Sequence, residues 1–332
     1  MSTHNIDKII SYVLKTVDEH KKAPGAYARW LLQDANGTHN LEPSEYGCAD
    51  AANILYTLGF FPRDLEERAA SVAVLRSFQK PDGRFEEPTH HTLHTTAHCV
   101  AALELFDAAP DIPLRYHMEN FGTIDKFVSF LEAGDWGHDV WQSHKGAGPY
   151  AAMAICCDMP LEWHDAYFNF FTERVNKKTG VNIEGADDEN KNALFHLASW
   201  FHMMFNFSYA HRAFPNAERC VDSMIDFICN KRGPRFGKVM SFNEVDWIYL
   251  INRASMQTGY RREEAKEHMR NFAKDYIAYL EEDIENLYKE KFDDLHALFG
   301  MTCALAELQL ALPGEIKSTV PLKNVLDRRP FI

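Results

Sequence analysis

The sequence predicts an all-α protein and, more specifically, an α/α toroid: an (α/α)6 barrel of six outer and six inner helices in a single domain over residues 1–332. Charged, amphipathic helical segments alternate along the chain with less charged ones. The less charged segments begin near residues 46, 90, 143, 190, 241 and 293, which is one every 44 to 53 residues. Such a period is typical of stacked helical hairpins, with apolar helices inside and amphipathic helices outside. Strand-like alternation is nearly absent.

The composition is that of a globular protein with an acidic surface. With 332 residues, 46% of them hydrophobic, the chain can bury a large core. It lacks a run of about 18 apolar residues that could span a membrane, and its N-terminus lacks the pattern of a secretory signal. Seven cysteines without a CxxC pair indicate free thiols and a cytoplasmic protein. The net charge of −13 argues against nucleic acid and anionic membranes as partners.

The individual elements follow from local patterns. Apolar residues at helical spacing between Ile6 and Val17 predict a first amphipathic helix, and a long polar connection leads to an apolar helix over residues 47–59. A charged helix opens at Pro62, and a histidine-rich helix begins near Thr89. Later charged helices are predicted near 123–132, 160–175, 214–230 and 262–287, and the less charged ones begin near Ser143, Asn190, Ser241 and Asp293.

The histidine-rich helix is the segment around which the rest is organised. It follows a tight turn at Pro81-Asp82-Gly83, in which Pro fixes φ and Gly accepts a positive φ. His90, His94 and His98 recur every four residues and therefore lie along one side of the helix. The helix is polar where it begins and apolar further on, which is typical of the wall of a cavity.

All connections from an outer to an inner helix lie on the same face of the predicted fold. They are the long ones, and they cover residues 21–45, 79–89, 133–142, 176–189 and 231–241. The turns on the other face, such as 59–62 and 157–160, are short. Because sites are usually built from long loops on a rigid scaffold, we expect the functional groups at the face with the long connections.

Two segments show a resemblance to a known family. Residues 79–85 read Gln-Lys-Pro-Asp-Gly-Arg-Phe, and residues 95–105 read Thr-Thr-Ala-His-Cys-Val-Ala-Ala-Leu-Glu-Leu. This pair resembles the prenyltransferase/squalene-cyclase repeat, in which a Q-x-x-D-G-x-F/W turn leads into T-x-x-A-x-x-A-L. Residues 176–182 look like a degenerate second copy of the turn. The resemblance covers about thirty residues and implies an α/α toroid of the terpenoid-cyclase type.

The chemistry of that family does not carry over to this chain. Its cyclases protonate the substrate with Asp-x-Asp-Asp, whereas residues 185–188 begin with glycine. A DDxxD metal motif would end in aspartate, whereas residues 187–191 end in lysine. The zinc ligands of protein prenyltransferases have no counterpart either. We expect the repeat turn to tie neighbouring hairpins together, and we infer function from the site residues.

The loop over residues 134–144 is the segment of the predicted mouth with the highest density of aromatic, acidic and histidine side chains. It contains Trp136, Trp141, His138, Asp139 and His144, and a second aspartate. Indole faces beside carboxylates suit sugar rings, which stack on the indole and need hydrogen-bond partners for their hydroxyls. We therefore predict substrate binding here, although one tryptophan could instead seal the fold and the histidines could be solvated.

Acidic residues also begin several other inner helices. We predict Asp139 and Asp188 as opposed carboxylates for acid/base chemistry, with Asp246 in reserve. Each acid alone could equally be a helix cap, since the helix dipole stabilises a carboxylate at that end. Arg84 and Arg235 lie in similar turns and could recognise a carboxylate or phosphate, or simply be solvated.

The histidines allow three interpretations. His94 and His144 have a suitable intrinsic pKa for general bases. His90, His94 and His98 have a helical spacing that could hold a divalent metal, with His144 as a further ligand, although no cofactor is firmly indicated. They could also simply line a polar wall, which is the interpretation we favour for His98. His202 lies in an aromatic and methionine run over 199–207 that reads as core.

The leading functional hypothesis is an enzyme that hydrolyses or eliminates a carbohydrate substrate, a small molecule or an oligosaccharide, at the mouth of the toroid. The predicted catalytic residues are Asp139, Asp188, His94 and His144. The predicted substrate-binding residues are Trp136, Trp141, His138, Arg84, His90, Asp246, Trp247 and His296. A terpenoid-cyclase-like enzyme with an apolar cavity and a non-catalytic α/α binding module are the alternatives.

Overall fold

The computed structural model describes residues 3–137, 139, 141–183, 193–230, 236–282, 284 and 293–329, with the backbone alone for 193–196. In this part of the chain there are fourteen helices and four strands of two or three residues, so the all-α prediction is confirmed. The helices are α1 (Asp7–His20), α2 (Glu45–Leu58), α3 (Leu65–Ser77), α4 (Thr92–Leu105), α5 (Arg115–Phe121), α6 (Ile124–Glu132), α7 (Gln142–Cys156), α8 (Leu161–Arg174), α9 (Ala193–Tyr209), α10 (Ala217–Cys229), α11 (Phe242–Thr258), α12 (Arg262–Glu282), α14 (Leu295–Ala311) and α15 (Val325–Arg328). The strands are β1 (His4–Asn5), β2 (Lys21–Ala23), β3 (Ala26–Tyr27) and β4 (Ile316–Lys317), paired β1 with β4 in parallel and β2 with β3 antiparallel.

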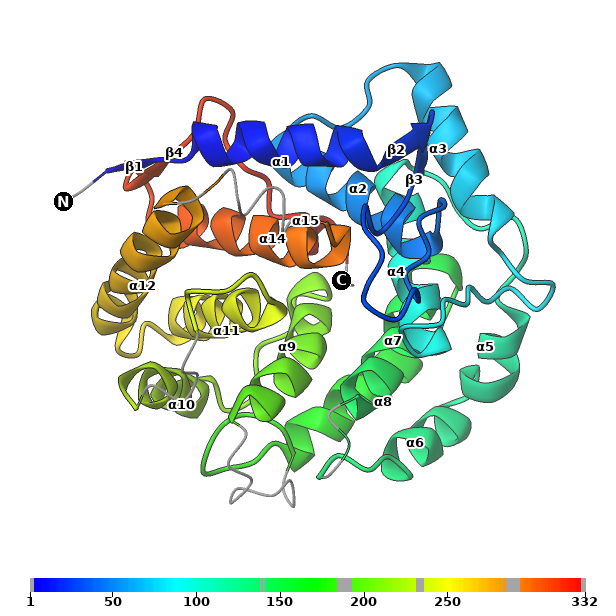
Figure 1. The fold of residues 1–332 in the computed structure, drawn as a ribbon. Helices are drawn as coiled ribbons and strands as arrows, with labels where there is room; N and C mark the ends of the chain where they lie inside the picture. Colours follow the sequence, from blue (N-terminus) through cyan, green and yellow to red (C-terminus); the bar gives the residue numbers. More distant parts are fainter. Residues whose placement is uncertain are drawn as a thin grey trace.

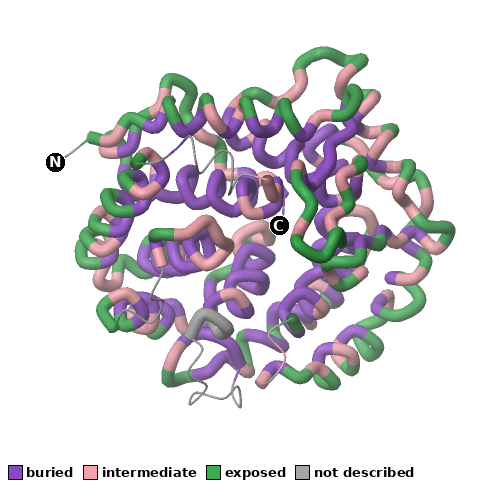
Figure 2. The backbone as a smooth tube through the Cα atoms, in the orientation of Figure 1, coloured by how far each residue is buried: buried purple, intermediate pink, exposed green. Residues whose placement is uncertain are grey.

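Six helices, which we call the core helices, make up the centre of the molecule: α2, α4, α7, α9, α11 and α14. Each contacts the next in the order of the chain, and α14 contacts α2, so the contacts return to the helix from which they started. They are buried on nearly all sides, as Figure 2 shows. They begin within three residues of the positions predicted from the sequence.

The remaining long helices are amphipathic and pack against the outside of the core helices (Figure 1). α1 contacts α2, α12 and α14; α3 contacts α2 and α4; α8 contacts α6 and α7; and α10 and α12 contact α11. In α10, for example, only one face is buried, which is the face expected to meet a neighbouring helix. The predicted charged segments near 123–132, 160–175 and 214–230 correspond to α6, α8 and α10.

The predicted turn before the histidine-rich helix is confirmed, and it holds two segments together. Gly83 has φ +93, and a Cβ there would lie 2.3 Å from the carbonyl oxygen of Pro113. The Gln79 side chain donates hydrogen bonds to the carbonyls of Gly83 and Ile112, at 3.0 and 2.6 Å. At the second glycine turn, Gly180 has φ +65, and a Cβ there would lie equally close to the backbone at the start of α10. Both turns therefore anchor the chain against the segment that follows.

The helix after this turn begins slightly later than the sequence predicts. We expected a cap at Thr89, but α4 begins at Thr92 and its cap is His91. The carboxylate of Glu87 accepts hydrogen bonds from the Thr89 amide and hydroxyl, which folds residues 87–90 into a turn of their own. His90 consequently lies in this turn, ahead of the helix.

Two expectations concern the surroundings of the protein. All seven cysteines lie in the described part of the chain and are free, and Cys48, Cys99, Cys220 and Cys303 are buried. None of the described helices combines the length and the apolar character that crossing a membrane requires.

Candidate functional site

A cluster of histidines lies among five of the core helices, and all of its helical members except His202 lie in the N-terminal half of their helix. What we call the histidine cluster consists of Tyr46, Asp50, His90, His94, His98, His144, His202 and His296. These residues come from α2, α4 and the turn before it, α7, α9 and α14, and all but His90 are buried. The Tyr46 ring lies among them, with its centroid 4.2 Å from that of His90 and 4.8 Å from that of His98.

The first part of the cluster is built on Asp50. One carboxylate oxygen, Oδ1, accepts hydrogen bonds from His98 Nε2 at 2.9 Å and from His296 Nδ1 at 3.1 Å. The Asp50 side chain has no exposed surface, and its other oxygen has no hydrogen-bond partner. A buried carboxylate needs hydrogen-bond donors, and here two imidazole nitrogens supply them.

The second part of the cluster is made of three imidazoles from three helices. His94 of α4, His144 of α7 and His202 of α9 each place a ring nitrogen so that the three atoms lie within 4.8 Å of one another. The ring centroids of His94 and His144 are 4.1 Å apart, and those of His144 and His202 are 4.5 Å apart. We call these residues the histidine triad. Gly148 brings α7 close enough to α4 for this contact, because its missing Cβ leaves room for the Leu93 carbonyl.

Burial decides the charge of the cluster. It lowers the pKa of His202 to about 4, and it lowers the pKa of His98 to about 3 despite the opposing effect of Asp50. The pKa values of His94 and His144 also lie well below 6.5, because of burial and then because of the other imidazoles nearby. Burial alone would raise the pKa of Asp50, but the attraction and hydrogen bonds of His296 and His98 outweigh it and lower that pKa. At neutral pH the Asp50 carboxylate therefore lies beside the neutral imidazole of His98.

The edge of the cluster is held by a buried arginine. Arg29 donates two parallel hydrogen bonds to the Asp294 carboxylate, at 2.9 and 3.2 Å, and one to the Thr89 hydroxyl at 2.7 Å. Its guanidinium lies over the Tyr46 ring, 5.3 Å from the centroid. Asp294 also caps α14 by accepting from the His296 amide. One side chain thus fixes three separate segments around the histidines.

A cavity of about 360 Å³ opens beside the histidine triad. We call it the mouth pocket; it is lined by Pro88, Thr89, His90, His91, Asp139, Trp141, His144 and Lys145. Its volume lies within the range of small-molecule sites. Asp139 Oδ2 accepts a hydrogen bond from Lys145 Nζ at 2.7 Å, and the Trp141 side chain is unusually open for its type, with the residue 57% exposed. The centroid of its ring is 4.7 Å from that of His144.

The structure brings together only part of the predicted site. His90, His94, His144 and His296 belong to the histidine cluster, and His90, Asp139, Trp141 and His144 line the mouth pocket. Asp188, His138 and Arg235 lie outside the described residues, so the proposed pairing of Asp139 with Asp188 stays a prediction.

Two of the predicted sugar-binding tryptophans lie in the hydrophobic core and do not line the mouth pocket. Trp136 is 5% exposed, and its Nε1 donates a hydrogen bond to the Leu131 carbonyl at 2.8 Å. Gly146 leaves the space that this indole fills. Trp247 is fully buried and donates to the Met224 carbonyl at 2.9 Å. An indole with its N–H bonded to backbone and its faces covered is a packing residue.

Two polar residues of the prediction lie apart from the cluster. Arg84 is paired with Asp82 at 2.7 Å and lies over the Tyr116 ring, beside the turn that it follows. Asp246 is buried and neither carboxylate oxygen has a hydrogen-bond partner. Burial and then the nearby Glu244 raise the pKa of Asp246 well above its usual range.

The predicted catalytic and substrate-binding residues did not include Tyr46, Asp50, His98 and His202, although His98 was considered as a metal ligand. A signal for Asp50 existed, because it is an isolated acid in a helix that is otherwise nearly uncharged. A charge in such a helix requires a partner inside the protein. The signal for His202 was weaker, because it is one polar residue in an aromatic run, where core packing is the default interpretation.

Comparisons of the chain with protein-family models, with curated proteins and with solved structures find no match. The site is therefore interpreted from its own geometry.

Proposed function

We propose that the chain folds as an α/α toroid and is an enzyme that hydrolyses or eliminates a carbohydrate substrate in the mouth pocket. The toroid is supported by the cyclic order of contacts among the core helices, with amphipathic helices outside them. The two glycine turns at Gly83 and Gly180, each packed on the next segment, support kinship in fold with the prenyltransferase/squalene-cyclase repeat.

One observation carries the functional proposal: a cavity of about 360 Å³ is lined at once by an exposed indole, an ion pair and a buried neutral imidazole. The open face of Trp141 suits the C–H face of a sugar ring. His144 is neutral, so it can accept a proton from water in hydrolysis or from carbon in elimination. The Lys145 ammonium, held by Asp139, can bind a substrate carboxylate or protonate the leaving oxygen.

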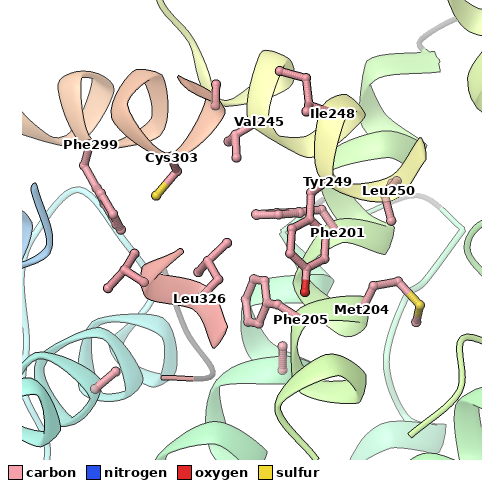
Figure 3. Close-up of a cluster of buried hydrophobic side chains, with 14 of the residues drawn as sticks. Phe201, Met204, Phe205, Val245, Ile248, Tyr249, Leu250, Phe299, Cys303 and Leu326 are labelled. Atoms are coloured by element: carbon pink, nitrogen blue, oxygen red, sulfur yellow. The ribbon is translucent and has the colours of Figure 1, made fainter. Parts of the chain in front are cut away.

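The interior beyond the histidine cluster favours this proposal over an isoprenoid cyclase. Apolar side chains from α9, α11 and α14 meet there, and Leu326 of α15 lies among them (Figure 3). Among the described residues, a cavity beside Val245, Tyr249 and Leu326 has a volume of about 10 Å³. That is room for about one water molecule, whereas an isoprenoid chain needs a cavity many times larger. The mouth pocket is the better place for a substrate.

The test is a panel of neutral and acidic oligosaccharides. Binding is measured by calorimetry, and turnover by mass spectrometry and by the ultraviolet absorbance of an unsaturated elimination product. We expect Trp141→Ala to weaken binding of a productive sugar by roughly tenfold or more, and His144→Gln to abolish turnover. Phe60→Ala is the matched control and should bind the sugar as the wild type does. Phe60 is a similarly exposed aromatic residue, but it follows the C-terminal end of α2, whereas the histidine cluster lies toward the N-terminal end of that helix.

Three results would contradict the proposal. If no sugar of the panel binds better to the wild type than to Trp141→Ala, the carbohydrate assignment fails. If His144→Gln and Asp139→Asn turn over a bound sugar at the wild-type rate, these residues are not the catalytic groups and the proposed mechanism fails. If a sugar binds in the mouth pocket and the wild type does not turn it over, the binding-module alternative holds.

A further inference from the structure

We infer that His94, His144 and His202 form a binding site for a divalent transition metal of the zinc type, with one coordination position open toward the mouth pocket. Metal binding does not require the proposed carbohydrate activity, but the role we give the bound water below rests on it.

The positions of the nitrogens are the first argument. Zinc in proteins is bound at about 2.0–2.1 Å by imidazole nitrogens in tetrahedral geometry, so two such nitrogens lie roughly 3.3 Å apart. The ligand atoms of the triad already lie within 4.8 Å of one another. Each pair therefore has to approach by at most about 1.5 Å, which small rotations of the side chains can supply. The three residues come from three core helices, so the site is part of the rigid scaffold.

The second argument is the hydrogen bonding of the outer ring nitrogens. His202 Nδ1 lies 2.7 Å from the Ala198 carbonyl oxygen, to which it donates, so the metal would be bound by Nε2. His94 Nδ1 is hydrogen bonded to the Tyr46 hydroxyl. Histidine ligands of metals usually engage their other nitrogen in this way, with a carbonyl or another outer group that orients the ring. The triad thus has an outer shell for two of its three members.

Charge and ligand type select the metal. Three neutral nitrogens suit zinc, copper, nickel, cobalt or iron, whereas magnesium and calcium prefer oxygen ligands. All three imidazoles are buried, and imidazole binds a metal in its neutral form. Asp50, in the other part of the cluster, supplies a buried negative charge, and the positive charge of Arg29 is paired with Asp294.

The site is of the catalytic kind because it is open on one side. A structural zinc site has four protein ligands, whereas a catalytic one has three and a water. His144 belongs to the triad and also lines the mouth pocket, so the fourth position faces the substrate space. In the metal-bound protein His144 is a ligand. A water in the fourth position would lose a proton to solvent in the mouth pocket more readily than free water does, and the resulting hydroxide would attack or deprotonate the sugar.

The experiment uses the full-length protein without any sugar. Metal-free protein is prepared with a chelator and titrated with Zn²⁺ by calorimetry and with Co²⁺ by visible absorption, which reports four-coordinate nitrogen sites. We expect one equivalent of either metal. His144→Gln and His202→Gln should each weaken binding by at least about 100-fold, and Tyr46→Phe by about 10- to 100-fold. His164→Gln, which alters a histidine of α8 outside the cluster, should bind as the wild type does.

A variant that fails to fold does not decide the question, so the wild type is also measured directly. Nitrogen-15 NMR of the imidazoles should show the Nε2 of His202 shifted by Zn²⁺. The inference is overturned if wild-type protein binds less than half an equivalent, or if both folded triad variants bind as the wild type does. Sugar turnover by metal-free protein would overturn the catalytic role alone, and metal binding without turnover of any sugar would leave the site and refute the proposed function.

Discussion

Replacing His117 by phenylalanine should make the protein markedly less sensitive to acid. His117 lies in α5, is fully buried, and has no hydrogen-bond partner for either ring nitrogen. Its neighbours include the rings of Phe121 and Tyr116, whose centroids are 5.8 and 5.9 Å from its own. Burial, and then the nearby charge of Arg84, lowers its pKa from 6.5 to about 4. Protonation therefore favours the unfolded chain.

The size of the effect follows from these two pKa values. Between about pH 6.5 and pH 4 the unfolded chain binds more protons at this residue than the folded protein does, so the free energy of unfolding falls as the pH falls. From pH 7.5 to pH 5 this residue alone should remove about 2 kcal/mol. Phenylalanine does not titrate, so the advantage of His117→Phe over the wild type should grow by that amount. At pH 7.5 the free energy of unfolding of His117→Phe should also exceed that of the wild type by about 1–3 kcal/mol, because the variant no longer buries an unsatisfied polar group at this position.

The assay is urea unfolding followed by circular dichroism at both pH values. Phe121→Leu is the control, because it disturbs the same packing without removing a titratable group. It should lower the free energy of unfolding by about 1 kcal/mol at either pH. If the difference between His117→Phe and the wild type is the same at pH 7.5 and at pH 5, the burial argument for this histidine is refuted.

Three further changes test the packing of the site. Asp50→Ala should lower the free energy of unfolding by about 3–5 kcal/mol, because His98 and His296 lose the acceptor that they share; a loss below about 1 kcal/mol in urea unfolding would contradict this. Leu326→Ala should lower the free energy of unfolding by about 2–5 kcal/mol in the same measurement, since Leu326 is 3% exposed among apolar neighbours. The control Leu161→Ala, at a residue that is 64% exposed, should change that free energy by less than about 0.5 kcal/mol. Gly148→Ala should lower the free energy of unfolding by about 1–3 kcal/mol and weaken Co²⁺ binding in the absorption titration. The reason is that a Cβ would lie 2.5 Å from the Leu93 carbonyl oxygen and push α7 away from α4. An unchanged Co²⁺ affinity would show that the triad does not depend on the close approach of these two helices.

The helices could be predicted from the sequence because burial on all sides leaves a clear pattern. The core helices carry few charges, and polar or glycine-rich segments separate them, so their starts could be located within three residues. The start of α4 was placed too early because Thr89 is a good cap by itself. The Thr89 hydroxyl instead donates to the Glu87 carboxylate and accepts from Arg29, and a propensity for one residue does not include these partners.

The site could be predicted only where the sequence spacing fixes a direction. His94 and His98 follow one another at helical spacing, so their common face was evident. The partners from other helices depend on how each core helix is rotated about its axis, and no local pattern gives that angle. His202 lies near the middle of α9, which begins at Ala193, whereas His144 lies in the first turn of α7, which begins at Gln142. Trp136 and Trp141, five residues apart in the segment before α7, also lie in different environments: Trp136 fills the space at Gly146, and Trp141 is exposed at the mouth pocket.

The composition of the histidine cluster is an argument for a function, because polar groups in a core generally contribute less stability than apolar side chains would. Apolar side chains of similar volume would often give equal or greater stability than a buried carboxylate with its imidazole donors. Tyr46 contacts both parts of the cluster: it stacks on His98, which is bonded to Asp50, and its hydroxyl is bonded to His94 of the triad. If the cluster existed only to pack, removing that hydroxyl would change stability alone. If the cluster binds a metal, Tyr46→Phe should keep the ring packing and still weaken metal binding. A loss of metal affinity without a matching loss of stability therefore distinguishes the two explanations.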